Sequence, residues 1–221
     1  MSIQTNQVPV MTTRRPHATR AAKFAGAMTV AVATLAGATG CTSQQQAGQS
    51  AAYLTIDALE AASGAEPDKF ATGLASDVQT NGGIVADSAQ ITVRTVMKDP
   101  GSSSNPSSPS TTNLITINRY HVKYVRADGR NQQGVDVPYE FDGALTFTAQ
   151  AGGSKGSFTL VRVQAKLEAP LLALRGLGGA ITIATLAEVT LYGNDQAGRP
   201  VSVTGTISVN FADWADPKSG D

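Results

Sequence analysis

The fold is decided by residues 201–211, VSVTGTISVNF, near the C-terminal end of the sequence. Apolar side chains and one glycine occupy every odd position of this stretch, and Ser, Thr or Asn occupies every even one. A period of two places all the apolar side chains on one face of a β-strand, whereas a helix would scatter them around its axis. The stretch therefore predicts a strand with one buried face.

The preceding residues 181–191, ITIATLAEVTL, follow the same alternation. Residues 193–200, GNDQAGRP, lie between the two runs and consist of residues that favour turns. Two alternating runs joined by such a segment predict an antiparallel hairpin, here with a loop somewhat longer than the tightest type.

Further strands are expected over 91–97, 143–149 and, as a short edge strand, 74–80. Residues 53–61 suit either a strand or a short helix, and their alternation favours the strand.

Two further runs, 114–126 and 157–167, change phase part-way. A slip of one residue would invert the buried face of a strand, so we expect either bulges or strands that cross between sheets. The slips fall near Asn118 and Arg119 in the first run and near Leu160 and Val161 in the second.

Seven or eight strands without long helices between them predict an all-β fold, an antiparallel two-sheet sandwich, preceded by a disordered signal peptide and tether. Through the hairpin of residues 181–211, the layout resembles the immunoglobulin-like or fibronectin type III-like sandwiches of bacterial surface proteins. The Cys…Trp…Cys framework of antibody domains is absent, because Trp214 lies at the end of the pattern. The sandwich is expected over 52–214, with a polar tail at 215–221.

The N-terminal region has the pattern of an export signal. Residues 24–40, FAGAMTVAVATLAGATG, are uncharged and follow a basic segment, and they are too short and too rich in small residues for a permanent membrane span. The start of translation is Met1 or Met11.

The single cysteine of the chain, Cys41, follows this run directly. Residues 35–41, LAGATGC, resemble the lipobox of bacterial lipoproteins, although Ala38 stands where Leu is usual. The resemblance implies cleavage after Gly40 and acylation of Cys41, which would anchor the protein to a membrane of the cell envelope on its extracytoplasmic side. The alternative is a free cysteine in an ordinary signal peptide. Residues 41–51 are polar and small, as in a flexible tether.

Charge excludes one class of partner. Residues 1–40 carry four basic residues and no acidic ones, so residues 41–221 hold 13 basic and 17 acidic side chains, a net charge of −4. A nucleic-acid-binding protein needs a basic face, so we expect no nucleic-acid partner. One cysteine also excludes an internal disulfide and a thiolate zinc site.

The densest group of candidate binding residues lies between residues 126 and 142. The expected binding loop combines acids, amides, a base and an aromatic ring: Asp128, Arg130, Asn131, Asp136, Tyr139 and Glu140. Carboxylate oxygens could hold calcium, but EF-hand spacing is absent, so no cofactor or metal site is assigned.

No catalytic residue is predicted. His121 is the one histidine after residue 40, and alternation places it on a polar strand face beside Arg119 and Lys123 without a nucleophile. Two other segments are expected on the surface: a Ser- and Pro-rich loop at 99–112 that cannot pair in a sheet, and an apolar stretch at 168–174 that forms a short cap helix or a docking patch.

These features predict a non-enzymatic, membrane-anchored lipoprotein that acts as a binding or scaffolding module for an envelope protein or glycan. The alternative is a ligand- or calcium-binding accessory subunit of an envelope transport or assembly system.

Overall fold

The computed structural model describes residues 48–214, which form a mainly β fold with ten strands in three sheets. The strands, in chain order, are β1 (Ala52–Ala62), β2 (Gly73–Asp77), β3 (Asp87–Met97), β4 (Gly101–Ser102), β5 (Asn105–Pro106), β6 (Ile115–Val125), β7 (Phe141–Ala149), β8 (Ser154–Val161), β9 (Ile183–Asp195) and β10 (Pro200–Ala212). The short helices are η1 (Thr111–Asn113), α2 (Val163–Leu167) and η2 (Leu171–Leu174).

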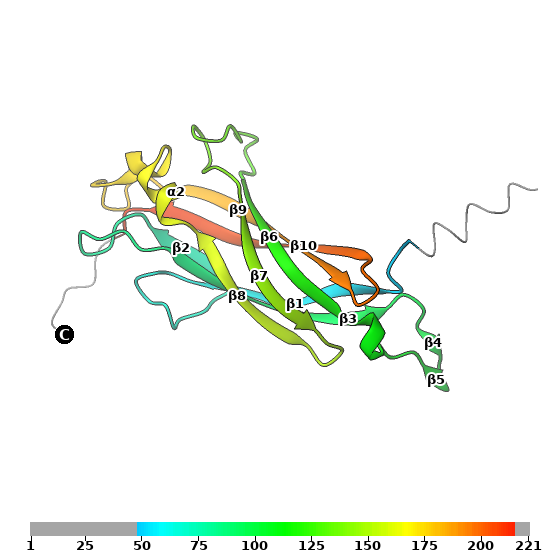
Figure 1. The fold of residues 1–221 in the computed structure, drawn as a ribbon. Coiled ribbons are helices and arrows are strands. Elements are labelled where there is room, and N and C mark those ends of the chain that lie inside the picture. The colour runs from blue at the N-terminus through cyan, green and yellow to red at the C-terminus, as the bar shows by residue number, and fades with distance from the viewer. Residues whose placement is uncertain (1–47, 215–221) are drawn as a thin grey trace, which may run out of the picture. The chain divides into compact units, whose positions relative to one another are not determined.

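The largest sheet has five strands in the order β2-β10-β9-β6-β7, and it curls around the core (Figure 1). The second has three strands in the order β1-β3-β8, and β4 pairs with β5 in a separate hairpin. All pairs are antiparallel except β2 with β10, which are parallel, so the five-stranded sheet is mixed. The prediction of antiparallel sheets was therefore wrong for this edge pair, whose two strands are far apart in the sequence and are not joined by a hairpin.

One hydrophobic core joins the two larger sheets. The Tyr124 hydroxyl on β6 donates a 2.7 Å hydrogen bond to the Leu160 carbonyl on β8, and its ring meets Phe211 of β10 edge-on at 5.5 Å. At the other side, the Thr95 hydroxyl on β3 donates to the Ala149 carbonyl on β7 at 2.9 Å. Apolar burial supplies the stability, and these bonds satisfy polar groups that burial would otherwise leave without partners.

The structure confirms the hairpin on which the fold prediction rests. Strand β10 covers the whole of 201–211, with Ile207, Val209 and Phe211 buried, and β9 pairs with it antiparallel. Ile181 was predicted within β9 but precedes it and is 54% exposed. The strands expected at 53–61, 91–97, 143–149 and 74–80 are also confirmed, as β1, β3, β7 and the edge strand β2.

Both predicted phase slips are β-bulges. The pairing of β6 with both neighbours shifts between Ile117 and Arg119, and the pairing of β3 with β8 skips Leu160. Beyond Val161 the prediction was wrong, because residues 163–167 form α2 rather than the continuation of a strand. The helix turns back over the end of the sheet and buries Ala165 and Lys166.

Two further expectations need correction. The Ser- and Pro-rich loop does pair, through β4 and β5, although only with itself and away from the main sheets. With that hairpin the strands number ten rather than seven or eight. At 168–174 a short helix is confirmed as η2, which buries Leu171 and Leu174 and leaves Leu172 exposed.

No helix within residues 48–214 is long and apolar enough to cross a membrane. Gly40 and Cys41, with the predicted signal peptide and most of the predicted tether, lie outside the described residues. The last residues of that tether contact the domain: Ser50 is buried, and the Gln49 carbonyl accepts a hydrogen bond from Arg199.

Candidate functional site

The predicted binding loop is held together mainly by its own polar groups. The Asp128 carboxylate accepts hydrogen bonds from the guanidinium groups of Arg126 and Arg130, at 2.7 and 2.8 Å for the shortest pairs. These bonds hold the pKa of Asp128 well below its ordinary value. The Asp128 carboxylate is therefore already paired with the two arginines of its own loop.

Of the other candidate residues in this loop, two form hydrogen bonds to its backbone and one is exposed on the surface. The Asn131 and Asp136 side chains accept hydrogen bonds from the backbone N–H groups of Arg126 and Gln132. Tyr139 is 50% exposed, and its ring lies against Gly134. The six candidate residues thus occupy one loop, but four of them form hydrogen bonds within it. The calcium alternative gains no support, because no group of three His, Cys, Asp or Glu side chains is placed to hold a metal ion anywhere in residues 48–214.

The polar face of β6 is flanked by acids that the sequence did not place there. His121 lies 3.4 Å from Asp142 and 3.6 Å from the sixth candidate, Glu140. Asp142 also forms a 3.0 Å ion pair with Arg119. The alternation correctly predicted that His121 lies between two cations. The nearby carboxylates could not be predicted in this way, because they belong to β7 and the segment before it, and their position depends on how β7 pairs with β6.

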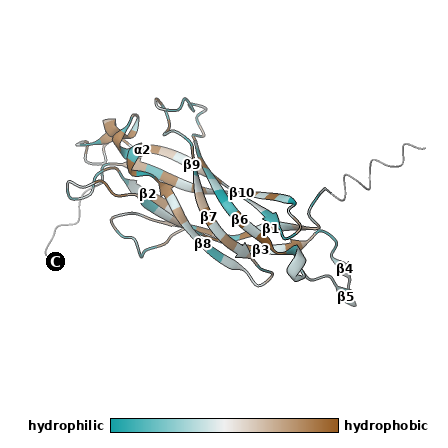
Figure 2. Cartoon of the chain, in the orientation of Figure 1, coloured by the Kyte–Doolittle hydropathy of each residue, from teal (hydrophilic) through white to brown (hydrophobic). Residues whose placement is uncertain are grey.

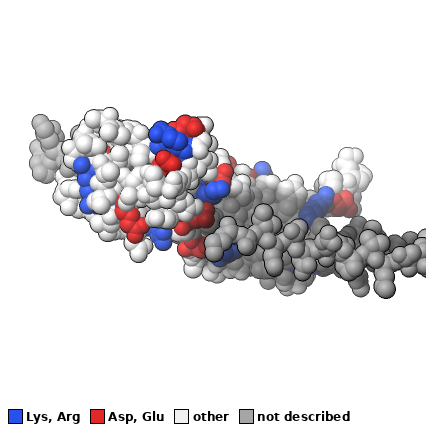
Figure 3. All heavy atoms as spheres, turned by 90° about the horizontal axis from the view of Figure 1, so that it is seen from above, with Lys and Arg blue, Asp and Glu red and all other residues white. Residues whose placement is uncertain are grey.

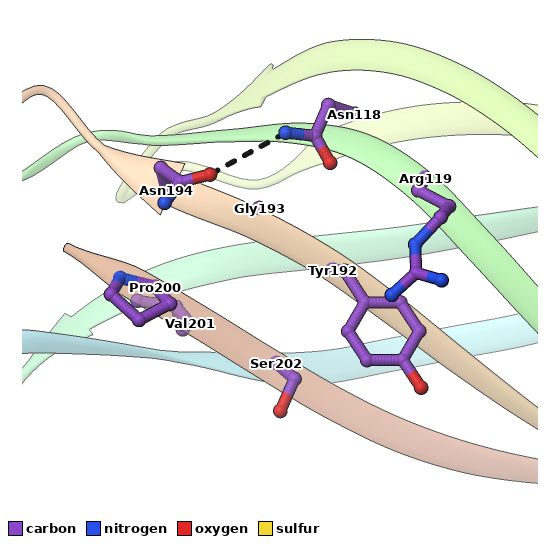
Figure 4. A pocket seen from close by; sticks show the side chains of 8 residues that line it. All are labelled: Asn118, Arg119, Tyr192, Gly193, Asn194, Pro200, Val201 and Ser202. Carbon is purple, nitrogen blue, oxygen red and sulfur yellow. Dashed lines mark hydrogen bonds between the residues drawn. The ribbon is translucent and has the colours of Figure 1, made fainter. Parts of the chain in front are cut away.

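A hollow with a mixed polar and apolar lining lies on the outer face of the five-stranded sheet and has a volume of about 490 Å³ (Figure 4). It lies where the β6 bulge meets β9 and the start of β10. The residues that line it are Asn118, Arg119, Tyr192, Gly193, Asn194, Pro200, Val201 and Ser202.

The β6 bulge supplies two of the side chains that line this hollow. Asn118 has no Cα partner on β7 or β9, and its amide nitrogen lies 3.4 Å from the Asn194 side-chain oxygen. The next residue, Arg119, lies with its guanidinium 4.1 Å from the centre of the Tyr192 ring. In Figure 4 the Arg119 side chain extends from β6 toward the Tyr192 ring on β9.

Several polar groups of the hollow have free hydrogen-bonding capacity. The hydroxyls of Tyr192 and Ser202 and the side-chain oxygen of Asn118 make no hydrogen bond to any residue in the described range 48–214. Because they are exposed to solvent they carry no desolvation penalty, and they can bind a ligand by exchanging water.

A second hollow of about 300 Å³ adjoins the first and shares Pro200, Val201 and Ser202 with it. Its other walls are the N-terminal residues 48–50 and 52, together with Tyr53 and Lys98. The two hollows together form what we call the β10 groove, which passes over the first residues of β10 and carries one tyrosine in each half.

The loops of the molecule do not converge on this groove. The turn 196–199 lies at the start of β6, because Ile115 pairs with Asp195, whereas the loop 126–140 follows the end of β6. The residues after β10 lie at the same end as 126–140, since Phe211 pairs with Ile183. The predicted binding loop and the groove are therefore at opposite ends of the strands (Figure 1).

Asp195 organises the turn beside the groove and is only 4% exposed. Burial alone would raise its pKa, but hydrogen bonds from the Arg199 backbone, the Ser50 hydroxyl and the Ala197 backbone outweigh burial and lower the pKa. A lowered pKa in the folded state stabilises the fold above the unfolded value of 3.8, and this contribution is lost as the pH falls below that value.

We therefore expect Asp195→Asn to lower the free energy of unfolding by about 1 kcal/mol at pH 7, with a smaller difference at pH 3. Urea denaturation at both values measures the effect, with Asp68→Asn, a change at an exposed acid, as the control. A deficit of the same size at both pH values would contradict this role.

The comparisons add little to this geometry. No protein-family model and no curated protein matches the chain. Among solved structures, the chain is similar to one described as the X-ray structure of Northeast Structural Genomics Consortium target SoR45. The similarity covers 78% of this chain and 92% of that chain, with 11% sequence identity and a TM-score of 0.33, which is too low to support an argument.

Proposed function

We propose that this protein is an extracytoplasmic lipoprotein, anchored to a membrane through Cys41, that acts as a non-enzymatic binding or scaffolding module of the cell envelope. The observation that supports it best is the β10 groove, a hollow of free polar side chains on a rigid sheet. Sites built on strands hold their side chains more precisely than sites on loops.

The connection between anchor and domain fits this role. Six residues separate Cys41 from Gly48, the first described residue, so the seven steps between their Cα atoms span at most about 25 Å. Gly48 and Gln49 themselves line the second hollow, so an anchor at Cys41 would hold the β10 groove near the membrane surface. The loop 126–140, at the other end of the strands, would then face away from it.

The finer fold assignment belongs to the same proposal. We propose that the two larger sheets form an immunoglobulin-like sandwich. In this sandwich the edge strands β1 and β2 would meet along one side, and the edge strands β7 and β8 would meet along the other. The contacts from Tyr124 to Leu160 and from Thr95 to Ala149 support two facing layers.

Replacement of Cys41 tests the anchor. We expect Cys41→Ser to move most of the protein from the membrane fraction to the soluble fraction and to abolish metabolic labelling with a fatty acid, because acyl chains supply the binding free energy. Ser43→Ala, two residues further on, is the matched control and should leave both properties unchanged. A Cys41→Ser variant that stays in the membrane fraction would contradict lipid anchoring.

A further inference from the structure

We propose that the β10 groove binds an uncharged, hydroxyl-rich saccharide chain. The inference rests on the proposed binding role of the protein, but not on its lipid anchor.

The first half of the groove has a balanced charge. Arg119 is its one ionised side chain, and Asp142 neutralises it through a 3.0 Å ion pair. On the face of the molecule seen in Figure 3, charges of both signs are scattered and no broad area of one sign is present. An anionic ligand such as a phosphate would require a surplus of positive charge, which this half does not offer.

The same half offers donors and acceptors side by side. The Asn118 oxygen accepts hydrogen bonds, while the hydroxyls of Tyr192 and Ser202 both donate and accept. A sugar hydroxyl also donates and accepts at one atom, so a lining of amides and hydroxyls matches it without leaving a charge unpaired. A peptide partner would be expected to bury an apolar anchor instead, and the lining offers no deep apolar pocket for one.

Each half also carries an aromatic ring. Tyr53 is 41% exposed in the second hollow, and Tyr192 lies in the first, with Pro200 shared between them. Tyrosine rings present an apolar body with a polar tip, which suits the C–H face and the hydroxyl rim of a pyranose ring. Arg119 covers one face of the Tyr192 ring, so a sugar would contact the part of this ring that Arg119 leaves open. Two rings separated by a shared wall favour a chain of several sugar units over a single one. Lys98 lines the second half and forms no ion pair within residues 48–214, so this half carries one positive charge, and the acidic probe below tests whether that charge selects an anionic saccharide instead.

The rigidity of the groove supports binding without rearrangement. The residues of its first half belong to β6, β9 and β10, which are paired along their whole shared length apart from the bulge. The Thr190 and Thr204 hydroxyls, 2.8 Å apart, join β9 to β10 on the same face. A preformed site loses less conformational entropy on binding.

Isothermal titration of the purified full chain in detergent tests the proposal, with cellohexaose, maltohexaose, fully N-acetylated chitohexaose and polygalacturonate fragments as probes. We expect one of the three neutral hexasaccharides to bind, and Tyr192→Ala and Tyr53→Ala each to weaken that binding by about tenfold or more. Tyr139→Ala removes a tyrosine that is 50% exposed, against 41% for Tyr53, at the opposite end of the strands, and it should leave the affinity unchanged.

Three results would overturn the proposal: binding of none of the neutral probes, binding of the acidic fragments alone, or binding that Tyr139→Ala weakens while the groove variants do not. The anchored scaffold of the proposed function would survive each of them, because it is tested separately by the fractionation of the Cys41→Ser variant. Circular dichroism of each variant confirms that the loss of a tyrosine has not unfolded the domain.

Discussion

Replacing Lys166 by alanine should lower the free energy of unfolding by about 3 to 5 kcal/mol. The Lys166 side chain is 2% exposed, and its ammonium group donates hydrogen bonds to the Asp87 carboxylate at 2.9 Å and the Val85 carbonyl at 2.7 Å. The Asp87 carboxylate also accepts from the Ser76 hydroxyl and the Gly64 backbone. Removal of the lysine leaves a fully buried carboxylate without its counter-charge.

This ion pair matters because it joins four segments at one end of the strands. Gly64 follows β1, Ser76 lies in β2, Asp87 begins β3 and Lys166 lies in α2. An exposed apolar area also lies at this end, over the α2–η2 segment (Figure 2), and includes Val163, Leu167 and Leu172. Without Lys166, α2 would lose its one ionic attachment to the described sheets, and local opening should increase there first.

Chemical denaturation of the wild type and of Lys166→Ala measures the loss. Lys155→Ala removes an exposed lysine from β8 and should change the stability by less than about 0.5 kcal/mol. The double variant Lys166→Met with Asp87→Asn should be more stable than Lys166→Ala, because it removes both charges and keeps an acceptor for Gly64. A loss below about 1 kcal/mol in the single variant would contradict this account.

The pH dependence gives a second readout of the same pair. Burial raises the pKa of Asp87, while the charge of Lys166 and the hydrogen bonds from Ser76 and Gly64 oppose the rise. Without the lysine the pKa should rise further, so the folded state of the variant would bind a proton more readily than the unfolded chain. The deficit of Lys166→Ala should therefore shrink as the pH falls toward the unfolded value of 3.8.

The contrast between Lys166 and Val209 explains how far the sequence could predict the fold. Val209 belongs to a run whose alternation alone determines its buried face, and the same holds for most of β1, β3, β9 and β10. Lys166 follows β8 in a run that continues to alternate, so the change from strand to helix carries no local signal. A lysine becomes a buried partner only because a carboxylate 79 residues away meets it.

The candidate site, like the fold, could be predicted from the sequence only in part. Composition predicted a binding loop at 126–142, and Asp128 and Arg130 do lie together there, but they bind each other. The β10 groove depends on Asn118, Tyr192 and Ser202, which lie on three strands and have no pattern in common in the sequence. The phase slip at Asn118 predicted the bulge, yet the hollow beside it follows only from the pairing of three strands.

Replacement of Gly193 should have the second large effect on stability. Gly193 was predicted at the start of the turn between the last two strands. Strand β9 instead continues to Asp195, and Gly193 pairs with Ile117 on one side and Val201 on the other. A Cβ atom at this position would collide with the Thr116 carbonyl oxygen and would lie 3.0 Å from the Ile117 Cα. Glycine is required here because the bulge brings two backbones together, which is a reason other than turn formation.

Gly193→Ala should therefore lower the free energy of unfolding by about 2 kcal/mol, since both obstructing groups belong to the backbone of a central strand and cannot rotate away. Gly152→Ala, where an added Cβ meets no atom within 4 Å, should be close to neutral. Urea denaturation compares the two, and hydrogen exchange at Thr116 and Ile117 should accelerate only in the first. Because Gly193 also forms part of the groove, the same variant should weaken saccharide binding while Gly152→Ala preserves it. Equal stability of the two glycine variants would mean that β6 can move away from β9 at the bulge, in which case the groove would not be a rigid, preformed site.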